Sequence, residues 1–140
     1  MNDVLLDLNV VLDVFLIRQP WVVEAEAVLE ANREGRITAY FSSASVPTLF
    51  YVVRKQRDLA LAHLAVADCL RSLTIVPIDY STLELARTLP GPDFEDNLQI
   101  ACAVQAKLGA IITRDATGFT SSPIIALTPS AFLAQMTPAP

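Results

Sequence analysis

Short apolar runs alternate with longer amphipathic stretches along almost the whole chain. The runs are rich in Val, Ile and Leu, as buried strands are, and they lie at residues 4–6, 37–41, 73–78, 110–113 and 124–127. The stretches between them predict helices at residues 10–16, 21–33, 45–57, 58–71, 81–88 and 94–108, with a last helix from residue 128. Strands that alternate with helices form a parallel sheet covered on both faces. The pattern therefore predicts an α/β protein, a three-layer α/β/α fold with a central, mostly parallel sheet of four to five strands.

A few residue types mark where the expected helices begin and end. Gly35 is typical of a helix end. Asp58 and Asp93 precede apolar stretches in the manner of N-caps. Ser42 and Ser43 are further candidate caps, for the helix expected after the second strand.

The length of 140 residues, with 53% apolar and 18% charged residues, is typical of one domain with a sizeable core. We expect a single domain over residues 1–140, with residues 137–140 frayed. No apolar run is long enough to span a bilayer and the first residues do not resemble a signal peptide, so we expect a cytoplasmic protein without a membrane partner. The surplus of apolar residues favours a homodimer interface.

Two cysteines and one histidine give little support for zinc chemistry. Cys69 and Cys102 lie among apolar residues, which predicts two buried thiols. His63 has no metal-binding residue at a useful spacing, and we expect it on the surface of a helix. The net charge of −5 disfavours nucleic-acid binding, although a cation held by carboxylates would reverse the local sign.

Two aspartates follow short strands directly. Asp7 comes after the first apolar run, and Asp115 comes shortly after the fourth. Ligands of open α/β sheets bind outside the carboxyl ends of the strands, so the two carboxylates could face one another there. The alternative for Asp7 is an end-of-strand turn residue that accepts from the amide of Asn9. The alternative for Asp115 is a residue of the turn at 114–118.

A third group of acids opens the helix expected at residues 94–108. Asp93 can cap this helix, and Glu95 and Asp96 in its first turn suit the helix dipole. The alternative is that Asp96 joins Asp7 and Asp115. Converging carboxylates need a cation, and a site with oxygen ligands alone indicates Mg²⁺ or Mn²⁺. Such an ion activates water and binds a phosphodiester oxygen, which favours phosphodiester hydrolysis.

Four segments in this order resemble the signatures of PIN-domain proteins. The segments are 5–12 (LLDLNVVL), 93–99 (DFEDNLQ), 111–119 (IITRDATGF) and 127–133 (LTPSAFL). The resemblance covers nearly the whole chain. It implies a metal-dependent ribonuclease fold, most often the VapC-like toxin of a bacterial type II toxin–antitoxin pair, with RNA as substrate and an antitoxin protein as partner.

Carried over position by position, the resemblance implies that Asp7, Asp96 and Asp115 are the catalytic, metal-binding carboxylates. It also implies that Asn9 and Thr113 orient Asp7 and its neighbours. Many members of the family have a Glu in the helix after the second strand, whereas this chain has Thr48 near that position. A hydroxyl can hold a metal-bound water but adds no charge, which predicts weaker metal affinity or a fourth acid supplied by Asp93.

Three functions therefore remain open from the sequence. The leading one is a Mg²⁺- or Mn²⁺-dependent endoribonuclease that acts as a toxin. Its candidate phosphate contacts are Arg18, Arg54, Lys55, Arg57 and Arg114, each of which could equally lie on a solvated helix face. The second is a catalytically degenerate PIN-like domain that binds RNA or protein. The third, a receiver-type signalling domain, is disfavoured because Asp79 is a poor phosphoacceptor and no Lys follows residue 107.

Overall fold

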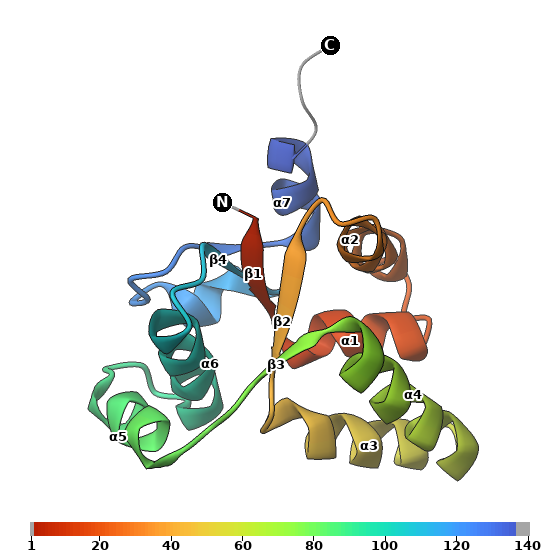
Figure 1. The fold of residues 1–140 in the computed structure, drawn as a ribbon, viewed down its shortest axis with the longest axis horizontal. Helices are drawn as coiled ribbons and strands as arrows, with labels where there is room; N and C mark the ends of the chain where they lie inside the picture. The colour runs from red at the N-terminus through yellow and green to blue at the C-terminus, as the bar shows by residue number, and fades with distance from the viewer. Residues whose placement is uncertain (1, 137–140) are drawn as a thin grey trace.

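The computed structural model describes residues 2–136, and it contains one five-stranded sheet in that range. The strands are β1 (Asp3–Leu6), β2 (Thr38–Ser42), β3 (Thr74–Val76), β4 (Ala110–Ile112) and β5 (Ala126–Leu127). Their order across the sheet is β3-β2-β1-β4-β5, and every neighbouring pair is parallel (Figure 1). The predicted α/β/α fold is thus confirmed, with β1 at the centre of the sheet.

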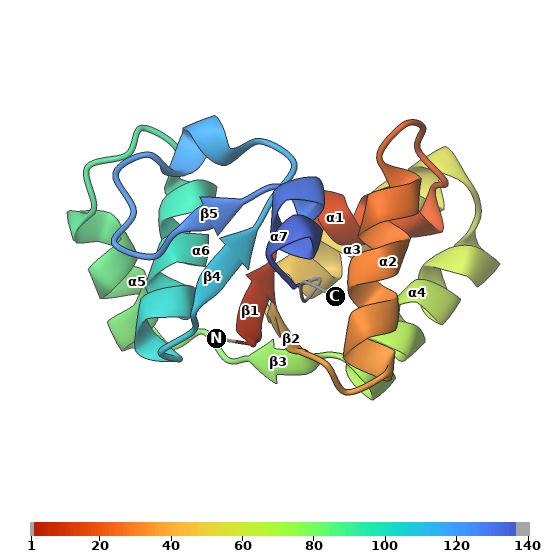
Figure 2. The same cartoon turned by 90° about the horizontal axis from the view of Figure 1, so that it is seen from above.

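Helices cover both faces of the sheet. They are α1 (Leu8–Phe15), α2 (Val22–Arg33), α3 (Ser45–Gln56), α4 (Leu59–Ser72), α5 (Tyr80–Thr88), α6 (Phe94–Gln105) and α7 (Pro129–Met136), with a 3₁₀ turn, η1, at Ala116–Phe119. Helices α5 and α6 lie on one side of the sheet, and α1 to α4 lie on the other (Figures 1 and 2). The short helix α7 packs against α2 on this second side.

The alternation of side chains along the strands divides the core in two. Val4 and Leu6 of β1 belong to the larger cluster beneath α1 to α4 and α7. Leu5, which points the other way, joins Ile111 of β4 in the cluster beneath α6. These three residues of β1 are fully buried, so an acid could not replace any of them without a large desolvation cost. Carboxylates are tolerated only outside this buried stretch, at exposed Asp3 before it and at Asp7 after it.

Helix ends follow the sequence signals in part. Gly35 ends α2 with a φ of 77°, and Asp58 caps α4, as predicted. The prediction for Ser42 and Ser43 was wrong, because α3 begins after Ala44 without a side-chain cap. Ser42 instead ends β2, and its Oγ accepts a hydrogen bond from the amide of Ala44 (3.2 Å).

Helix α6 is shorter than the predicted 94–108. It ends at Gln105 because the amide of Leu108 donates to the carbonyl of Ala103 (2.9 Å) and that of Lys107 to the carbonyl of Val104 (3.1 Å). Lys107 takes the left-handed conformation, with a φ of 57°, that this C-cap requires. A lysine is unusual at such a C-cap, so the sequence predicted that the helix would end at Gly109 instead. The predicted fraying of residues 137–140 lies outside the described residues.

The predicted positions of the cysteines and the histidine are confirmed. Cys69 and Cys102 are buried free thiols, and burial raises the pKa of Cys69 to about 12. His63 is exposed on α4, where its ring contacts Phe50 edge-on with the centroids 5.1 Å apart. Across residues 2–136, none of the helices has both the length and the apolar character that crossing a membrane would take.

Candidate active site

The predicted acids lie at the carboxyl ends of the central strands. Asp7 follows β1 and is the N-cap of α1. Asp115 follows β4 and is the N-cap of η1. Helix α6 leads into β4 and runs back along the sheet, so its first turn, with Asp96, returns to this same end. Three segments that are far apart in the sequence thus bring carboxylates to one edge of the sheet.

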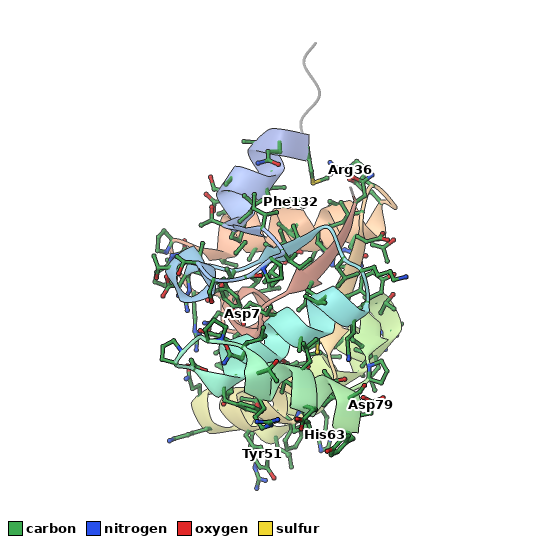
Figure 3. The ribbon with its side chains drawn as sticks, turned by 90° about the vertical axis from the view of Figure 1, so that its left-hand side faces the viewer. Asp7, Arg36, Tyr51, His63, Asp79 and Phe132 are labelled. Atoms are coloured by element: carbon green, nitrogen blue, oxygen red, sulfur yellow. The ribbon has the colours of Figure 1, made fainter. Side chains whose placement is uncertain are left out.

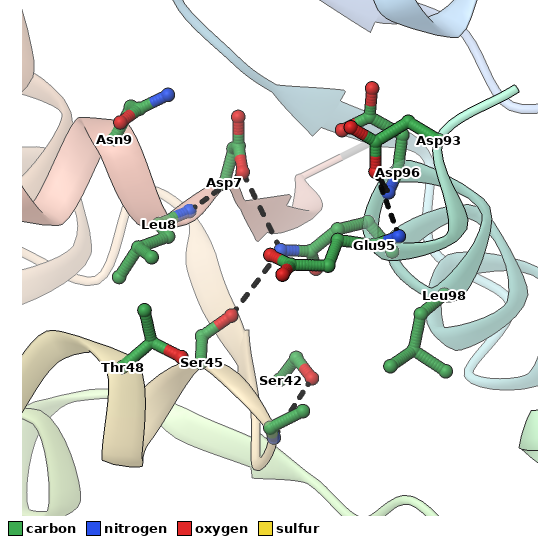
Figure 4. Close-up of a pocket in the computed structure, with 12 residues that line it drawn as sticks. Asp7, Leu8, Asn9, Ser42, Ser45, Thr48, Asp93, Glu95, Asp96 and Leu98 are labelled. Atoms are coloured by element: carbon green, nitrogen blue, oxygen red, sulfur yellow. Dashed lines mark hydrogen bonds between the residues drawn. The ribbon is translucent and has the colours of Figure 1, made fainter.

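Asp7 is held by donors from three directions. Its Oδ1 accepts from the amide of Leu8 at 2.8 Å and from Nε2 of Gln99 at 3.5 Å (Figure 4). Its Oδ2 accepts from the hydroxyl of Thr113 at 2.8 Å. Burial raises the pKa of Asp7, while the bonds from Thr113 and Leu8 and the charge of Arg114 act against that rise. The carboxylate is therefore fixed in orientation by groups that stabilise its ionised form.

Thr113 joins two of the predicted acids. It is 1% exposed, and besides donating to Asp7 it accepts a hydrogen bond from the amide of Asp115 at 3.2 Å. The carboxylate of Asp115 is exposed and accepts from the amide of Thr117 at 3.2 Å and from the Thr117 hydroxyl. Asp115 therefore has the hydrogen bonds of a turn residue and also lies beside the site.

Asp96 lies among other carboxylates. Its pKa is raised to about 6, most by burial and then by the charges of Asp93, Asp7, Asp115 and Glu95 in that order. A Cβ atom at Gly118 would lie 2.7 Å from Oδ2 of Asp96, so the η1 turn leaves room for this side chain only because residue 118 is a glycine. The helix cap is Asp93, whose Oδ1 accepts from the amides of Glu95 (2.8 Å) and Asp96 (3.1 Å).

A cavity of about 410 Å³ opens in front of Asp7. The α6 side contributes Asp93, Glu95 and Asp96, while Asp7 enters from the start of α1 (Figure 4). Asp115 is not among the residues that line this cavity and lies at its edge. The lining contains four carboxylates and neither Lys nor Arg, so the cavity is strongly acidic.

Asn9 and Thr48 also line the cavity. No hydrogen bond among residues 2–136 joins the side chain of Asn9 to Asp7. The backbone amide that donates to Asp7 is that of Leu8, and not that of Asn9 as in the turn alternative. Thr48 is exposed on α3, one turn after buried Ser45. The roles predicted for Asn9 and Thr48 stay predictions.

Sequence reasoning missed two polar residues of the site. Gln99 is 7% exposed and donates from Nε2 to Asp7 and to Oγ of Ser45 (3.3 Å), while its Oε1 has no partner in the described part of the chain. The signal was available, because Gln99 follows Asp96 by three residues and shares its helix face. Ser45 gave no such signal, since only the fold brings α3 beside α6.

The donor chemistry of the site fits a hard divalent cation. The charged groups that could bind a metal ion are all carboxylates. The amide oxygen of Gln99, which has no partner among the described residues, is a further oxygen beside Asp7. Among residues 2–136, no three His, Cys, Asp or Glu side chains come close enough together to enclose an ion. Mg²⁺ does not need such an enclosure, because it is held by one or two carboxylates and keeps several waters. The residues present therefore fit Mg²⁺ or Mn²⁺.

A sequence model of the family described as PIN domain matches residues 3–117. A comparison with curated proteins gives no match. Solved structures show the same fold, among them a toxin–antitoxin complex from Klebsiella pneumoniae, with a TM-score of 0.69 and 22% identity over 90% of this chain and 97% of that chain.

Two further structures have the same fold at lower identity. VapBC2 from Rickettsia felis, bound to a DNA fragment from its promoter, has a TM-score of 0.67 and 15% identity over 90% of this chain and 98% of that chain. The sarcin–ricin-loop-cleaving toxin VapC20 of Mycobacterium tuberculosis has a TM-score of 0.72 and 11% identity over 90% of this chain and 99% of that chain. Identities this low show a shared fold alone.

Proposed function

The chain belongs to the PIN domain family, and from this membership we propose that it is a metal-dependent endoribonuclease that hydrolyses RNA phosphodiester bonds. The observation that carries the proposal is that Asp7 and Asp96 line one acidic cavity at the carboxyl edge of the sheet, with Asp115 near enough for its charge to act on Asp96. Carboxylates that raise one another's pKa destabilise the free protein, so their arrangement favours a bound cation.

Asp7 and Asp96 are the proposed principal ligands of Mg²⁺ or Mn²⁺, with Asp115 at the edge and Asp93 as a fourth acid. When bound, the ion supplies a water of lowered pKa and a positive charge for a phosphate oxygen. Thr113 and Gln99 hold the Asp7 carboxylate in one orientation by donating to its two oxygens. Thr48 adds a hydroxyl to the wall but no charge.

The biological role that we propose is the toxin of a type II toxin–antitoxin pair. The named structural neighbours include a toxin–antitoxin complex and a sarcin–ricin-loop-cleaving toxin, and each covers 90% of this chain. On this proposal the partners are an RNA substrate, a cognate antitoxin and a second copy of the chain in a homodimer, and the protein acts in the cytoplasm.

A second function is favoured by one observation. Neither Thr48 nor any other residue of α3 supplies an acid to the cavity, and among residues 2–136 no three candidate ligands lie close together. A PIN domain with too weak a metal site would bind RNA or protein without cutting it. The two functions differ in metal affinity, which can be measured directly.

The test is Mn²⁺ titration followed by thermal melting, together with cleavage of a panel of structured and single-stranded RNAs. We expect Mn²⁺ to raise the Tm of the wild-type protein, and expect Asp7→Asn to lose both this rise and the cleavage. Asp3→Asn is the matched control, because Asp3 is an exposed acid at the other end of β1. A wild-type protein without a Mn²⁺-dependent rise and without cleavage of any RNA would overturn the nuclease proposal in favour of the binding module.

A further inference from the structure

A buried carboxylate lies behind the acidic cavity without being part of it. Asp13 on α1 is 1% exposed, and its Oδ1 has no hydrogen-bond partner within the described range. Two arginines approach it, with Nη1 of Arg18 at 3.7 Å from Oδ1 and Nε of Arg114 at 3.6 Å from Oδ2. An uncompensated buried charge is costly, so Asp13 must hold at least one of these guanidinium groups in place.

Arg114 has a second partner, on the face of its guanidinium. The guanidinium carbon lies 4.0 Å from the centroid of the Trp21 ring, which is cation–π distance. Asp13 faces the Nε edge, so the side chain is fixed both in plane and in tilt. Within residues 2–136 neither terminal nitrogen of Arg114 has a hydrogen bond, and the side chain is 23% exposed. Its strongest donors therefore remain available to a ligand.

Arg114 lies next to the acidic site. It stands between Thr113, which donates to Asp7, and Asp115, so it cannot move far from the site. Its positive charge acts on Asp7. The cavity wall itself has no basic side chain, and its four carboxylates repel a phosphate. An RNA phosphate next to this wall needs a cation supplied by the protein as well as the metal ion.

The other basic candidates lack this combination. Arg54, Lys55 and Arg57 are exposed at the end of α3, and the described residues offer them no ion pair. Arg18 shares Asp13 but makes no cation–π contact among residues 2–136, and Arg114 is the arginine whose charge lowers the pKa of Asp7. Arg114 is thus the cation that the fold orients.

We propose that Arg114 binds an RNA phosphate beside the acidic cavity, and that Asp13 and Trp21 are positioning residues that orient its guanidinium for this contact. The inference rests on the proposed ribonuclease function. A guanidinium presents a planar pair of N–H donors that matches two phosphate oxygens, and fixing it in advance lowers the entropic cost of binding.

The first experiment measures binding of a fluorescent single-stranded RNA to Asp7→Asn protein, which leaves the RNA intact. Adding Arg114→Ala is expected to weaken binding about 10-fold or more, as for loss of a charge-assisted hydrogen bond. The slope of log K against log salt should become shallower by about 0.7. The matched control is Arg36→Ala, since Arg36 precedes β2 at the amino ends of the strands, away from Asp7 (Figure 3).

The second experiment separates positioning from bulk charge. Asp13→Asn removes a negative charge, so bulk electrostatics alone would strengthen RNA binding. The proposal predicts the opposite sign, a weakening of about 3- to 10-fold. It also predicts that Asp13→Asn has no further effect once Arg114 is Ala. A strengthening, or two independent effects that add, would overturn the role of Asp13.

Trp21→Leu gives an independent test should Asp13→Asn fold poorly. We expect RNA binding to weaken about 3-fold, the size of an exposed cation–π contact. Val23→Ala, at an exposed position on α2, is the control. Arg114→Lys keeps the charge without the planar fork and should recover only part of the affinity.

The kinetic readout separates this inference from the proposed function. In otherwise wild-type protein, Arg114→Ala should raise the KM for RNA more than it lowers kcat, and leave the Mn²⁺-dependent Tm rise in place. If wild-type protein cuts RNA, Asp7→Asn does not, and Arg114→Ala has wild-type KM and RNA affinity, the function stands and this inference is wrong. If wild-type protein neither cuts RNA nor responds to Mn²⁺, the function itself has failed.

Discussion

Helices α5 and α6 pack side by side on one face of the sheet, and each begins with aspartate, yet the two beginnings have opposite electrostatics. Asp79 caps α5 and accepts from Ser81 Oγ at 2.8 Å and from the amide and hydroxyl of Thr82, both at 3.1 Å. These hydrogen bonds hold the pKa of Asp79 below its usual range. At the start of α6, burial and four neighbouring carboxylates raise the pKa of Asp96 to about 6.

The difference shows what separates a structural acid from a proposed catalytic one. Asp79 finds all its donors within three residues, so its local sequence fully accounts for it. Asp96 leaves the capping of α6 to Asp93, and the charges of Asp7, after β1, and of Asp115, at the start of η1, oppose its ionisation. An acid whose neighbours oppose its ionisation indicates a site built for a ligand.

The largest expected effect comes from replacing the aspartate by asparagine at the start of each helix. We expect Asp96→Asn to lower RNA cleavage by about 100-fold or more, because even the outer partners of a metal ion are worth about 10- to 100-fold. Asp79→Asn should leave the cleavage rate unchanged. The measurement is single-turnover cleavage at saturating Mn²⁺. Equal rates for wild-type and Asp96→Asn protein would remove Asp96 from the site.

The next effect concerns the residue that orients Asp7. Thr113→Val keeps the shape of the side chain but removes the hydroxyl that donates to Asp7 at 2.8 Å. We expect cleavage to fall about 10- to 100-fold with an increased Mn²⁺ requirement. Thr74→Val, an exposed Thr on β3, is the control. A loss that excess Mn²⁺ does not change, accompanied by a much lower Tm, would assign Thr113 to the core instead.

A smaller effect is expected on the stability of the metal-free protein. Asp96→Asn should lose activity but gain stability. The folded pKa of Asp96, about 6, exceeds the ordinary 3.8, so the folded state holds its proton more tightly than the unfolded chain does. This acid therefore lowers stability as pH rises from about 4 to about 6, and its cost persists above that range. In EDTA near neutral pH, Asp96→Asn should be more stable than wild type by about 1 kcal/mol, allowing for solvent screening.

Urea unfolding at several pH values measures this difference between Asp96→Asn and wild type. The advantage of the variant should shrink toward zero near pH 4, where Asp96 is protonated in both states of the wild-type protein. Saturating Mn²⁺ should reverse it, because only the wild type gains binding energy. An advantage that is the same at every pH would mean that the carboxylate repulsion is unimportant.

The smallest expected effect lies at the other helix start. Asp79→Ala removes the cap of α5 and should lower the Tm by a few degrees, with no dependence on Mn²⁺. The control Ser81→Ala removes one of the three donors to Asp79 and should have a smaller effect. A Tm unaffected by Asp79→Ala would contradict a structural role for this acid.

The sequence predicted most of the architecture, because strand and helix signals are local. Apolar runs located all five strands, and Asp58, Asp93 and Gly35 marked helix ends correctly. The end of α6 was missed because Lys107 takes the left-handed conformation, which a lysine in the sequence does not indicate. The single-domain organisation stays a prediction.

The sequence predicted those parts of the candidate site that follow from the strand topology, and not those that depend on how the helices pack. The carboxyl-edge rule brought Asp7 and Asp115 together, and the resemblance added Asp96. Gln99, Ser45 and the contact of Asp13 with Arg114 depend on how α1, α3 and α6 pack, at sequence separations of 54 residues for Gln99 and Ser45 and 92 for Gln99 and Asp7. The spacing of Gln99 from Asp96 could have indicated that both lie on one helix face, but no local pattern identifies the partners on other elements.

The central place of β1 in the sheet has a consequence for biosynthesis. Asp7 is synthesised before Thr113, whose hydroxyl orients it, and β1 has no partner on that side until β4 has been made. A growing chain that ends after β3 contains Asp7 but still lacks Asp96 and Asp115. On the proposed ribonuclease function, a chain that has not yet reached β4 would not cut RNA, and a partner could bind it before the site is complete.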